Sequence, residues 1–248
     1  MTAYRIISSD LDPATAIAPQ LYARLRDAII RNRFAPGDRI SESEIARSCD
    51  VSRQPVREAF IKLAGEGLLA VLPQRGTIIT KISYTAVLDA RFLREAIEAD
   101  IVAILAAAPN IPLIAELRRQ LQVQANVADS QSFIELDERF HRTLADAAGK
   151  RGTWRQIEGL KSQMDRVRFL SLGHFPVAKL IAQHAAIADQ IEAGDTSGAN
   201  AAIRGHLREV LSDLPQIRAA NPDFFDLPDG DIPEPVNAPI QASIKEEN

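Results

Sequence analysis

Four residues in the second half of the chain have the types and spacing of a metal site. Asp137 and His141 stand four residues apart in a segment with helical periodicity, so both side chains project from the same face of the predicted helix. His184 and His206 lie on consecutive predicted helices, each eleven residues from Asp195 in the turn between them. In an antiparallel hairpin both imidazoles then lie about 16 Å from the turn, at ~1.5 Å per residue, and can face one point inside a bundle.

One carboxylate and three imidazoles suit a first-row divalent ion, so we predict bound zinc, with nickel or manganese as alternatives. A single histidine is more often an ordinary core or surface residue, and an Asp-x-x-x-His pair often arises by chance. The equal spacing of His184 and His206 about the turn favours the metal interpretation. The fourth histidine, His174, falls in a turn between helices and is interpreted as a surface residue.

A second set of residues has the chemistry of DNA recognition. Arg53 and Arg57 stand four residues apart on a predicted helix that begins after Ser52, and Ser52 and Gln54 beside them are further predicted DNA contacts. The N-terminal side chains of a recognition helix contact base edges and phosphates, and arginine can bind guanine or phosphate through two parallel hydrogen bonds. An isolated arginine pair is more often solvated surface. Its position on the second helix of a helix-turn-helix reverses that preference.

Arg75 and Gly76 supply a further candidate DNA contact. They lie at the tip of a predicted β-hairpin whose strands are Leu69–Leu72 and Thr77–Thr80. A hairpin tip next to a flexible glycine can bring an arginine to a flanking minor groove or phosphate.

The segment 16–81 has the pattern of a winged helix-turn-helix. Apolar residues recur at helical spacing from Ile17, which predicts a first helix that ends near Phe34. The run Ser41-Glu42-Ser43-Glu44 is a capping-box pattern that opens a short second helix. A break follows at Cys49-Asp50, because aspartate tolerates the left-handed conformation of a tight turn. The third helix and the hairpin complete the domain.

Residues 82–214 predict an all-α antiparallel helical bundle. They are rich in alanine and leucine, contain no strand signal, and are divided by turn residues into six helical segments of roughly 16 to 26 residues. The proline-rich, acidic segment 215–248 is predicted to be disordered, and residues 1–15 to be a flexible N-terminus. The predicted fold class is therefore mostly α, a winged helix-turn-helix followed by a helical bundle.

The composition narrows the class of protein. The chain is 46% hydrophobic and 25% charged, as in ordinary globular domains, and has no run of 18 apolar residues that would predict a membrane span. The N-terminus lacks the pattern of a secretory signal, and a single cysteine excludes an internal disulfide, so we expect a cytoplasmic protein. The net charge is −4, yet residues 20–81 carry eleven Lys and Arg against seven Asp and Glu. That asymmetry is typical of a DNA-binding module, although ordinary charge scatter explains it about equally well.

Several motifs in the N-terminal segment closely resemble the winged-helix domain of GntR-family regulators. They are Pro36-Gly37, Ser41-Glu42-Ser43-Glu44-Ile45-Ala46, Val51-Ser52-Arg53-Gln54-Pro55-Val56-Arg57-Glu58-Ala59 and Gln74-Arg75-Gly76. The run 51–59 is the most specific of them. The resemblance implies that Arg53, Arg57 and the wing around Gly76 contact DNA. The turn reads Cys49-Asp50-Val51, where relatives usually have Leu-Gly-Val.

The metal residues resemble a family as well. An Asp-x-x-x-His helix followed by histidines on the last two helices is similar to the metal signature of the FCD-type effector domain, which is the usual partner of this winged helix in the FadR subfamily. All four metal positions match. The run Arg94-Glu95-Ala96-Ile97-Glu98 resembles the Arg-x-x-Leu/Ile-Glu motif of that domain, which implies that Arg94 points into an effector cavity. Together the two resemblances cover about residues 17–213.

The sequence therefore predicts a homodimeric, non-enzymatic transcription regulator, for example a repressor, that binds an inverted repeat in double-stranded DNA and no membrane. A single recognition helix contacts too few bases for useful specificity, which is why a dimer is expected. The metal and Arg94 are predicted to bind a small carboxylate such as a sugar acid, keto acid or dicarboxylate. Two alternatives stay open: a metallohydrolase that uses Glu98 or Glu135 as general base and is fused to a DNA-binding head, and a constitutive repressor with a structural metal.

Overall fold

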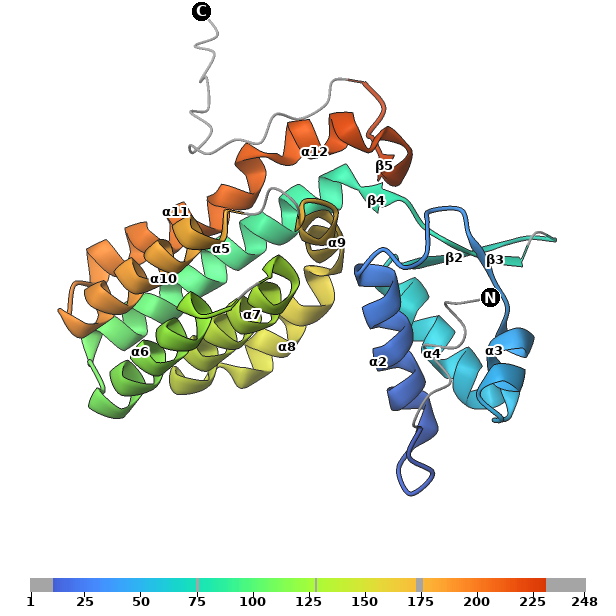
Figure 1. The fold of residues 1–248 in the computed structure, drawn as a ribbon, viewed down its shortest axis with the longest axis horizontal. Helices are drawn as coiled ribbons and strands as arrows, with labels where there is room; N and C mark the ends of the chain where they lie inside the picture. Colours follow the sequence, from blue (N-terminus) through green and yellow to red (C-terminus); the bar gives the residue numbers. More distant parts are fainter. Residues whose placement is uncertain (1–10, 75, 128, 173–175, 231–248) are drawn as a thin grey trace, which may run out of the picture.

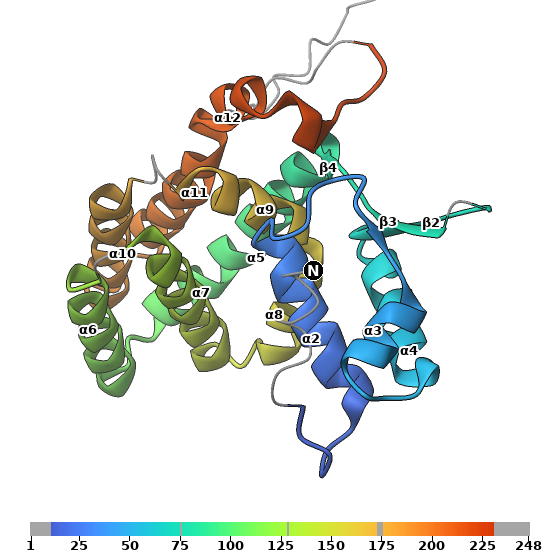
Figure 2. The same cartoon turned by 45° about the vertical axis from the view of Figure 1, so that its right-hand side comes forward.

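The computed structural model describes residues 11–230, except residues 75, 128 and 173–175, and shows a small N-terminal part beside a bundle of longer helices (Figures 1 and 2). The predicted fold class is confirmed. The N-terminal part consists of α2 (Ile17–Ile30), β1 (Arg39–Ile40), α3 (Glu42–Ser48), α4 (Arg53–Gly65), β2 (Leu69–Leu72) and β3 (Gly76–Ile79). The three strands form an antiparallel sheet in the order β1-β3-β2. Strand β1 extends the predicted two-stranded wing by one short strand.

The turn between α3 and α4 forms as its sequence predicts. Asp50 has a φ of 52°, in the left-handed region, and takes the conformation that a glycine would adopt there. Apolar side chains on one face of α4, including Val56 and Phe60, pack with Leu25 and Ile29 of α2 into one core. This core fixes the outward direction of the opposite face of α4.

Two local expectations in this part are wrong. The first helix ends at Ile30 instead of Phe34, because Asn32 turns the chain at a φ of 52°. Phe34 lies in the loop after the helix, and its side chain is buried in the core from there. The capping box does not form either. Ser41 occupies the N-cap position of α3, but its hydroxyl lies 3.3 Å from that of Ser43 and accepts no backbone hydrogen bond.

The C-terminal part is built from antiparallel helices (Figure 1). They are α5 (Tyr84–Ala107), α6 (Ile111–Ala125), α7 (Ser130–Ala147), α8 (Arg151–Leu160), α9 (Ser162–Leu170), α10 (Val177–Glu192), α11 (Thr196–Ser212) and α12 (Leu214–Ala220). Side-chain caps begin four of them, because Ser83, Asn110, Asp129 and Asp195 each accept a backbone N–H three residues on. None of the helices in the described ranges is long and apolar enough to cross a membrane.

The fourth of the six expected helical segments is divided in two. Lys161 separates α8 from α9. Its Nζ atom lies 2.6 Å from a carboxylate oxygen of Glu138 and 2.6 Å from one of Asp165. A continuous helical pattern in the sequence hides this break, because one of the two carboxylates that Lys161 contacts, Glu138, lies on the distant helix α7. The break lets α9 lie between the bundle and α2 (Figures 1 and 2).

The expected disorder of residues 215–248 is wrong for residues 215–226. Helix α12, a 3-10 turn (Pro222–Phe224) and β5 (Phe225–Asp226) follow, and β5 pairs in parallel with β4 (Ile82–Ser83). Phe225 is only 3% exposed and belongs to a cluster with Ile82, Met164 and Leu214. Apolar residues between the prolines thus anchor this segment. Residues 231–248 and 1–10 lie outside the described part.

Helix α9 contacts both parts of the molecule. On one side Gln163 donates to the carbonyl of Gly67 (3.0 Å), and Arg166 donates to the carbonyl of Thr80 (3.0 Å). Asn32 in the loop after α2 in turn donates to the carbonyl of Arg166 (2.9 Å). Gly67 and Thr80 flank the wing strands β2 and β3, so α9 holds the base of the wing.

Candidate metal centre and nucleic-acid interface

Four side chains from three helices converge inside the bundle. Asp137 and His141 project from α7, His184 from α10 and His206 from α11, and one potential ligand atom of each lies within 4.8 Å of the others. The Nε2 atom of His206 is 3.0 Å from Nε2 of His141 and 3.2 Å from Nε2 of His184. All four side chains are buried. The structure therefore brings the four residues with metal-site spacing to one point.

The second nitrogen of each imidazole faces an oxygen atom from a neighbouring helix. The three Nδ1···O pairs are His141 with Oε2 of Glu98 (2.5 Å), His184 with Oε1 of Gln124 (2.9 Å) and His206 with Oε1 of Gln183 (3.0 Å). Carboxylate and amide oxygens only accept, so each Nδ1 carries the proton and donates it.

The amide groups of the two glutamines are themselves oriented. Nε2 of Gln183 donates to Oε2 of Glu209 at 3.2 Å, and Nε2 of Gln124 donates to the carbonyl of Leu136 at 3.4 Å. Their oxygens must then face the histidines. With Nδ1 protonated, each Nε2 bears a lone pair that points to the common centre, where lone pairs and the Asp137 carboxylate repel one another. This donor set can hold a divalent cation, which removes the repulsion.

The two carboxylate oxygens of Asp137 have different neighbours. Oδ1 lies 3.4 Å from Nε2 of His184 and 3.8 Å from Nε2 of His206, whereas Oδ2 accepts a hydrogen bond from Arg168 at 2.7 Å. Burial raises the pKa of Asp137, but the Arg168 guanidinium and the imidazoles overcome that effect and lower the pKa well below its usual value. Asp137 is therefore a charged carboxylate with Oδ1 held toward the histidines.

Glu98 connects the centre to Arg94. Its Oε2 faces Nδ1 of His141, and its Oε1 accepts a hydrogen bond from Nε of Arg94 at 2.7 Å. Burial raises the pKa of Glu98, but Arg94 and His141 outweigh it and lower the pKa to about 2. The Nη2 atom of Arg94 is buried and has no hydrogen-bond partner among the described residues. It can donate to a ligand.

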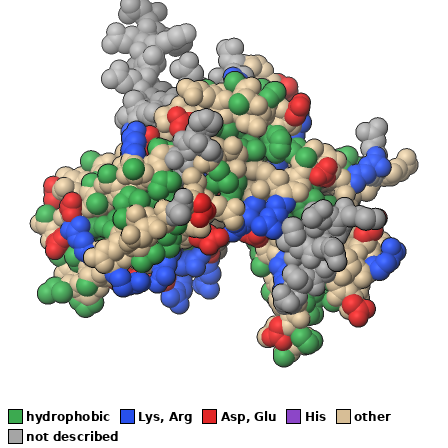
Figure 3. Space-filling model, viewed as in Figure 1, with side chains coloured by type: hydrophobic (Ala, Val, Ile, Leu, Met, Phe, Trp, Pro, Cys, Tyr) green, Lys and Arg blue, Asp and Glu red, His purple; other side chains and the backbone are tan. Residues whose placement is uncertain are grey.

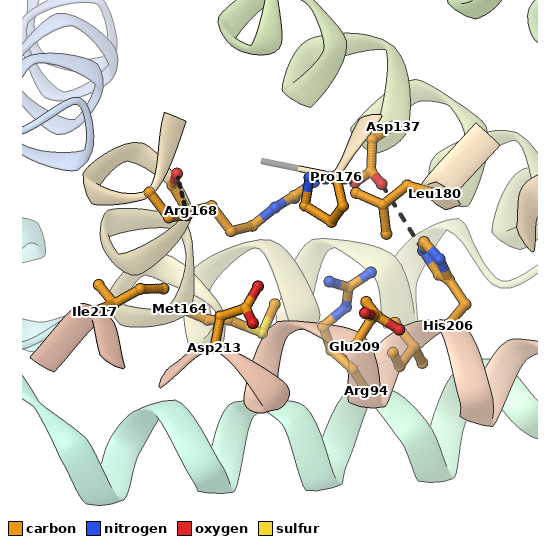
Figure 4. A pocket seen from close by; sticks show the side chains of 12 residues that line it. Arg94, Asp137, Met164, Arg168, Pro176, Leu180, His206, Glu209, Asp213 and Ile217 are labelled. Carbon is orange, nitrogen blue, oxygen red and sulfur yellow. Dashed lines mark hydrogen bonds and ion pairs between the residues drawn. The ribbon is translucent and has the colours of Figure 1, made fainter. Parts of the chain in front are cut away.

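A cavity of about 50 Å³ opens beside this centre, and Arg94, Asp137, Arg168 and His206 line it (Figure 4). In Figure 4 the guanidinium of Arg94 projects into the space below Asp137 and His206, and Arg168 reaches it from α9. The wall is completed mostly by apolar side chains, among them Met164, Leu180, Leu207 and Ile217. The cavity thus combines a cationic end with an apolar body, as sites for small anions do.

Sequence reasoning missed three residues of this site. Gln124 occupies a buried position on the apolar stripe of α6, and a polar residue at a core position is a signal that could have found it. Gln183 directly precedes His184, a position that carries no comparable signal. Arg168 is 31 residues from Asp137, and nothing in the sequence pattern relates them.

The predicted DNA-contacting residues of the helix lie on the outward face of α4. Ser52, Arg53, Gln54 and Arg57 are all exposed at or near its N-terminus. The Arg53 side chain is 68% exposed and only loosely paired with Glu42, at 3.4 Å. Figure 3 shows basic side chains on the outer edge of the winged-helix part, where α3, α4 and the hairpin face away from the bundle. These side chains can approach a duplex without rearrangement.

The wing tip is described only in part. Gly76 is exposed with a φ of 83°, a conformation that side-chain-bearing residues rarely adopt, and it begins β3. Arg75, the predicted wing contact, lies outside the described residues, as does His174.

Comparisons with known proteins agree with this architecture. Residues 17–79 match the family described as bacterial regulatory proteins, gntR family, and residues 89–209 match the FCD domain. The chain is similar to the HTH-type transcriptional repressor RspR of Escherichia coli, with 36% identity over 88% of this chain and 98% of that protein.

Two further relatives have the same organisation. An HTH-type transcriptional regulator in an unstable DNA locus of Streptomyces ambofaciens is 39% identical over 83% of this chain and 88% of its own length. The crystal structure of a GntR transcriptional regulator from Rhodococcus sp. RHA1 superimposes with a TM-score of 0.66 and 26% identity, and the match covers 83% of this chain and 99% of that one.

Proposed function

This chain belongs to the GntR family of bacterial transcription regulators and carries an FCD domain, and from that premise we propose that it is a DNA-binding repressor controlled by a small carboxylate. The carboxylate binds at a divalent metal ion held by Asp137, His141, His184 and His206, with zinc as the first candidate and nickel or manganese as alternatives. The E. coli relative that is named a repressor supports the direction of regulation.

The observation that carries the metal site is the convergence of three imidazole Nε2 atoms whose Nδ1 atoms all face acceptors. Histidines that only filled the core would not be expected to direct three Nε2 lone pairs at one another, because lone pairs repel. The same outer partners fix each ring in the tautomer and orientation of a metal ligand. A bound ion supplies positive charge at the end of the cavity and open coordination positions for a ligand oxygen.

Arg94 is proposed as the second anchor of the effector. It lies in the same cavity as Asp137 and His206, and its Nη2 has no partner among the described residues. A buried guanidinium N–H without an acceptor is costly, and a carboxylate oxygen of the effector satisfies it. Glu98 holds the other edge of Arg94, so the guanidinium keeps one orientation when the cavity is empty or filled.

We further propose that α9 carries the signal from the effector site to the winged helix. Lys161, Asp165 and Arg168 follow one another at intervals of four and three, so they share the side of the chain that faces Glu138 and Asp137. Gln163 and Arg166 point the other way, to the base of the wing. Because one short helix holds both sets of contacts, a ligand that draws Arg168 away from Asp137 also moves the wing contacts.

The contact between α9 and the winged helix has the properties of one that can change. Arg166 is fully buried, its Nε has no partner in the described part of the chain, and burial lowers its pKa to about 10. A buried and incompletely paired cation stabilises a contact only weakly. Small changes at α9 can therefore shift the equilibrium between orientations of the winged helix.

The proposed operator is an inverted repeat bound by a homodimer. Phe92, Leu93 and Ile104 on α5 are 65%, 38% and 48% exposed, so this helix leaves large apolar side chains that a second copy can cover. Phe92→Asp is expected to yield monomers in sedimentation velocity and to weaken operator binding. Ile111→Asp, at an exposed position of α6, is expected to leave the dimer intact. A dimer that survives Phe92→Asp would refute this interface.

The metallohydrolase alternative receives less support from the site. Glu98, one candidate base, is engaged by both Arg94 and His141, and its pKa of about 2 leaves it a poor proton acceptor. Glu135, the other, binds Arg31 at 2.6 Å and is absent from the cavity lining. A regulator with a structural metal differs from the main proposal only in its response to carboxylates.

The metal proposal is tested on the full-length protein. Purified protein is expected to contain about one divalent ion per chain, and chelation followed by addition of zinc is expected to lower and then restore the melting temperature. His206→Ala should reduce metal content, whereas Lys150→Ala, at an exposed site, should not. Protein that contains no metal and gains no stability from zinc, nickel or manganese would refute the site.

A carboxylate titration of the zinc-loaded protein then separates the two remaining functions. A saturable rise in melting temperature supports an effector site. The same protein without any such rise would be a regulator with a structural metal.

A further inference from the structure

The cavity beside the metal centre is charged differently at its two sides. Arg94, Arg168 and the proposed metal ion beside Asp137 and His206 supply positive charge at one side. Asp213, which joins α11 to α12, lies on the floor of the cavity, farther from His206 than Arg94 is in the view of Figure 4. A ligand that places its carboxylate on Arg94 must extend toward this second carboxylate.

Asp213 has little to neutralise it. Among the described residues, its only side-chain hydrogen bond comes from the hydroxyl of Ser212, at 3.5 Å, and none of them forms an ion pair with it. Although it stands at the N-cap position of α12, its side chain accepts no capping hydrogen bond. The carboxylate of Asp213 is therefore available to a group inside the cavity.

Glu209 provides the contrast. It lines the same cavity, but Lys179 lies 2.5 Å from its Oε1, and Gln183 donates to its Oε2. Both oxygens thus have partners, and one partner is a cation. The charge of Glu209 is thus offset by Lys179, whereas the charge of Asp213 acts on a ligand in the cavity.

Most of the wall between the two sides is apolar. Met164, Leu180, Leu207 and Ile217 line it together with Pro176, and Ser171 is the uncharged polar residue of this wall, so the ligand's middle lies mainly among carbon and sulfur atoms. A cavity of about 50 Å³ accepts only a short chain. In so small and partly dry a space, two carboxylates brought close together repel strongly, whereas a hydroxyl or ammonium group beside Asp213 donates to it.

We propose that this cavity selects short carboxylic acids that carry a hydroxyl or an ammonium group at the opposite end, and that Asp213 determines this selection. The inference rests on the proposed function, because it assumes that the acid's carboxylate binds the metal and Arg94. It narrows the ligand class, since it disfavours dicarboxylates and favours hydroxy acids, including sugar acids, or amino acids.

Four acids that differ only at the far end test the proposal: butyrate, succinate, 4-hydroxybutyrate and 4-aminobutyrate, with the corresponding three- and five-carbon sets alongside. Their dissociation constants for zinc-loaded full-length protein are measured by calorimetry. We expect the hydroxy or amino acid to bind about tenfold more tightly than the dicarboxylate, since like charges across a partly buried site disfavour binding. A preference for amino over hydroxy acids would identify charge pairing as the source, and equal affinity would identify hydrogen bonding.

Asp213→Asn is expected to remove the difference between succinate and 4-aminobutyrate, and Asp229→Asn, the same charge change at an exposed site, is expected to keep it. Glu209→Gln should have a smaller effect than Asp213→Asn, and Asp213→Ser, which also removes the charge, preserves the test if Asp213→Asn does not fold. Equal binding of all four acids, or tightest binding of succinate, would overturn the selection while leaving the carboxylate site intact. If no acid binds, the proposed function itself fails.

Discussion

Asp137 and Arg168 form a buried ion pair in which one carboxylate oxygen contacts the guanidinium, at 2.7 Å, and the other faces the three histidines. Arg168 lies on α9, which also holds the base of the wing through Gln163 and Arg166. Arg168 therefore links the candidate metal centre directly to the helix that contacts the DNA-binding part. Substitutions on α9 are therefore expected to affect either metal binding or the contact with the winged helix, depending on which side of α9 they change.

Arg168→Ala is expected to weaken metal binding by roughly 10- to 100-fold, because Asp137 loses the partner that orients its carboxylate. Zinc affinity measured by competition with a chromophoric chelator checks this. Arg168→Lys restores the charge and should recover part of the affinity. Unchanged affinity in Arg168→Ala would show that Asp137 is positioned by the histidines alone.

Arg166→Ala is expected to uncouple the two parts of the protein. Zinc content and carboxylate affinity should remain, while the effect of the carboxylate on operator affinity should shrink, because the contact with Thr80 is lost. Gln163→Ala removes the neighbouring contact with Gly67 and should act in the same direction. Fluorescence anisotropy with and without carboxylate measures the coupling. Full coupling in both variants would exclude α9 as the route.

Arg57→Ala is expected to weaken operator binding by about 1–3 kcal/mol if the residue contacts a base. The side chain is exposed on the recognition helix, so the folded structure should persist, as a melting curve would verify. Lys150→Ala removes the same charge from the distant bundle and serves as the control. If Arg53→Ala and Arg57→Ala both keep the affinity of the unmodified protein, α4 does not read the operator.

The metal-free protein is expected to lose stability as the pH falls from 7 toward 5. Burial lowers the pKa of His184, and burial together with His184 and His141 lowers the pKa of His206 well below its usual value. The unfolded chain protonates these groups near pH 6.5, so below that pH it binds more protons than the folded protein, and the free energy of unfolding decreases. Glu98 and Asp137, whose pKa values are lowered too, add their effect only below about pH 4.5.

Urea denaturation of the metal-free protein at several pH values measures this dependence. His206→Asn removes one of the titrating groups and should flatten the profile between pH 7 and 5. A profile equally steep in this variant would assign the dependence to other groups.

Phe225→Ala is expected to lower the free energy of unfolding by about 3 kcal/mol, because a large buried side chain leaves a cavity among Ile82, Met164 and Leu214. Leu227→Ala, at a site 41% exposed, should change stability little. Chemical denaturation compares the two. A negligible effect of Phe225→Ala would mean that the segment after α12 does not stabilise the domain.

Local periodicity and local turn chemistry were enough to predict several features from the amino-acid sequence. The recognition helix, the hairpin and the tight turn at Asp50 follow from spacing within about ten residues. The metal residues could be singled out because helix geometry converts equal distances from a turn into equal heights in the bundle. His184 and His206 are the clearest example, with Nε2 atoms 3.2 Å apart.

The residues that support that site depend instead on how the helices pack in three dimensions. Gln124 lies 60 residues from the histidine it orients, Glu98 lies 43 from His141, and Arg168 lies 31 from Asp137. No periodicity relates residues so far apart, because their contact depends on how whole helices pack. The same reason explains the break at Lys161 and the order of the segment that ends in Phe225. The ion pair of Lys161 with Glu138 on α7 and the apolar contacts of Phe225 with distant elements stabilise them, against the local preference of the sequence.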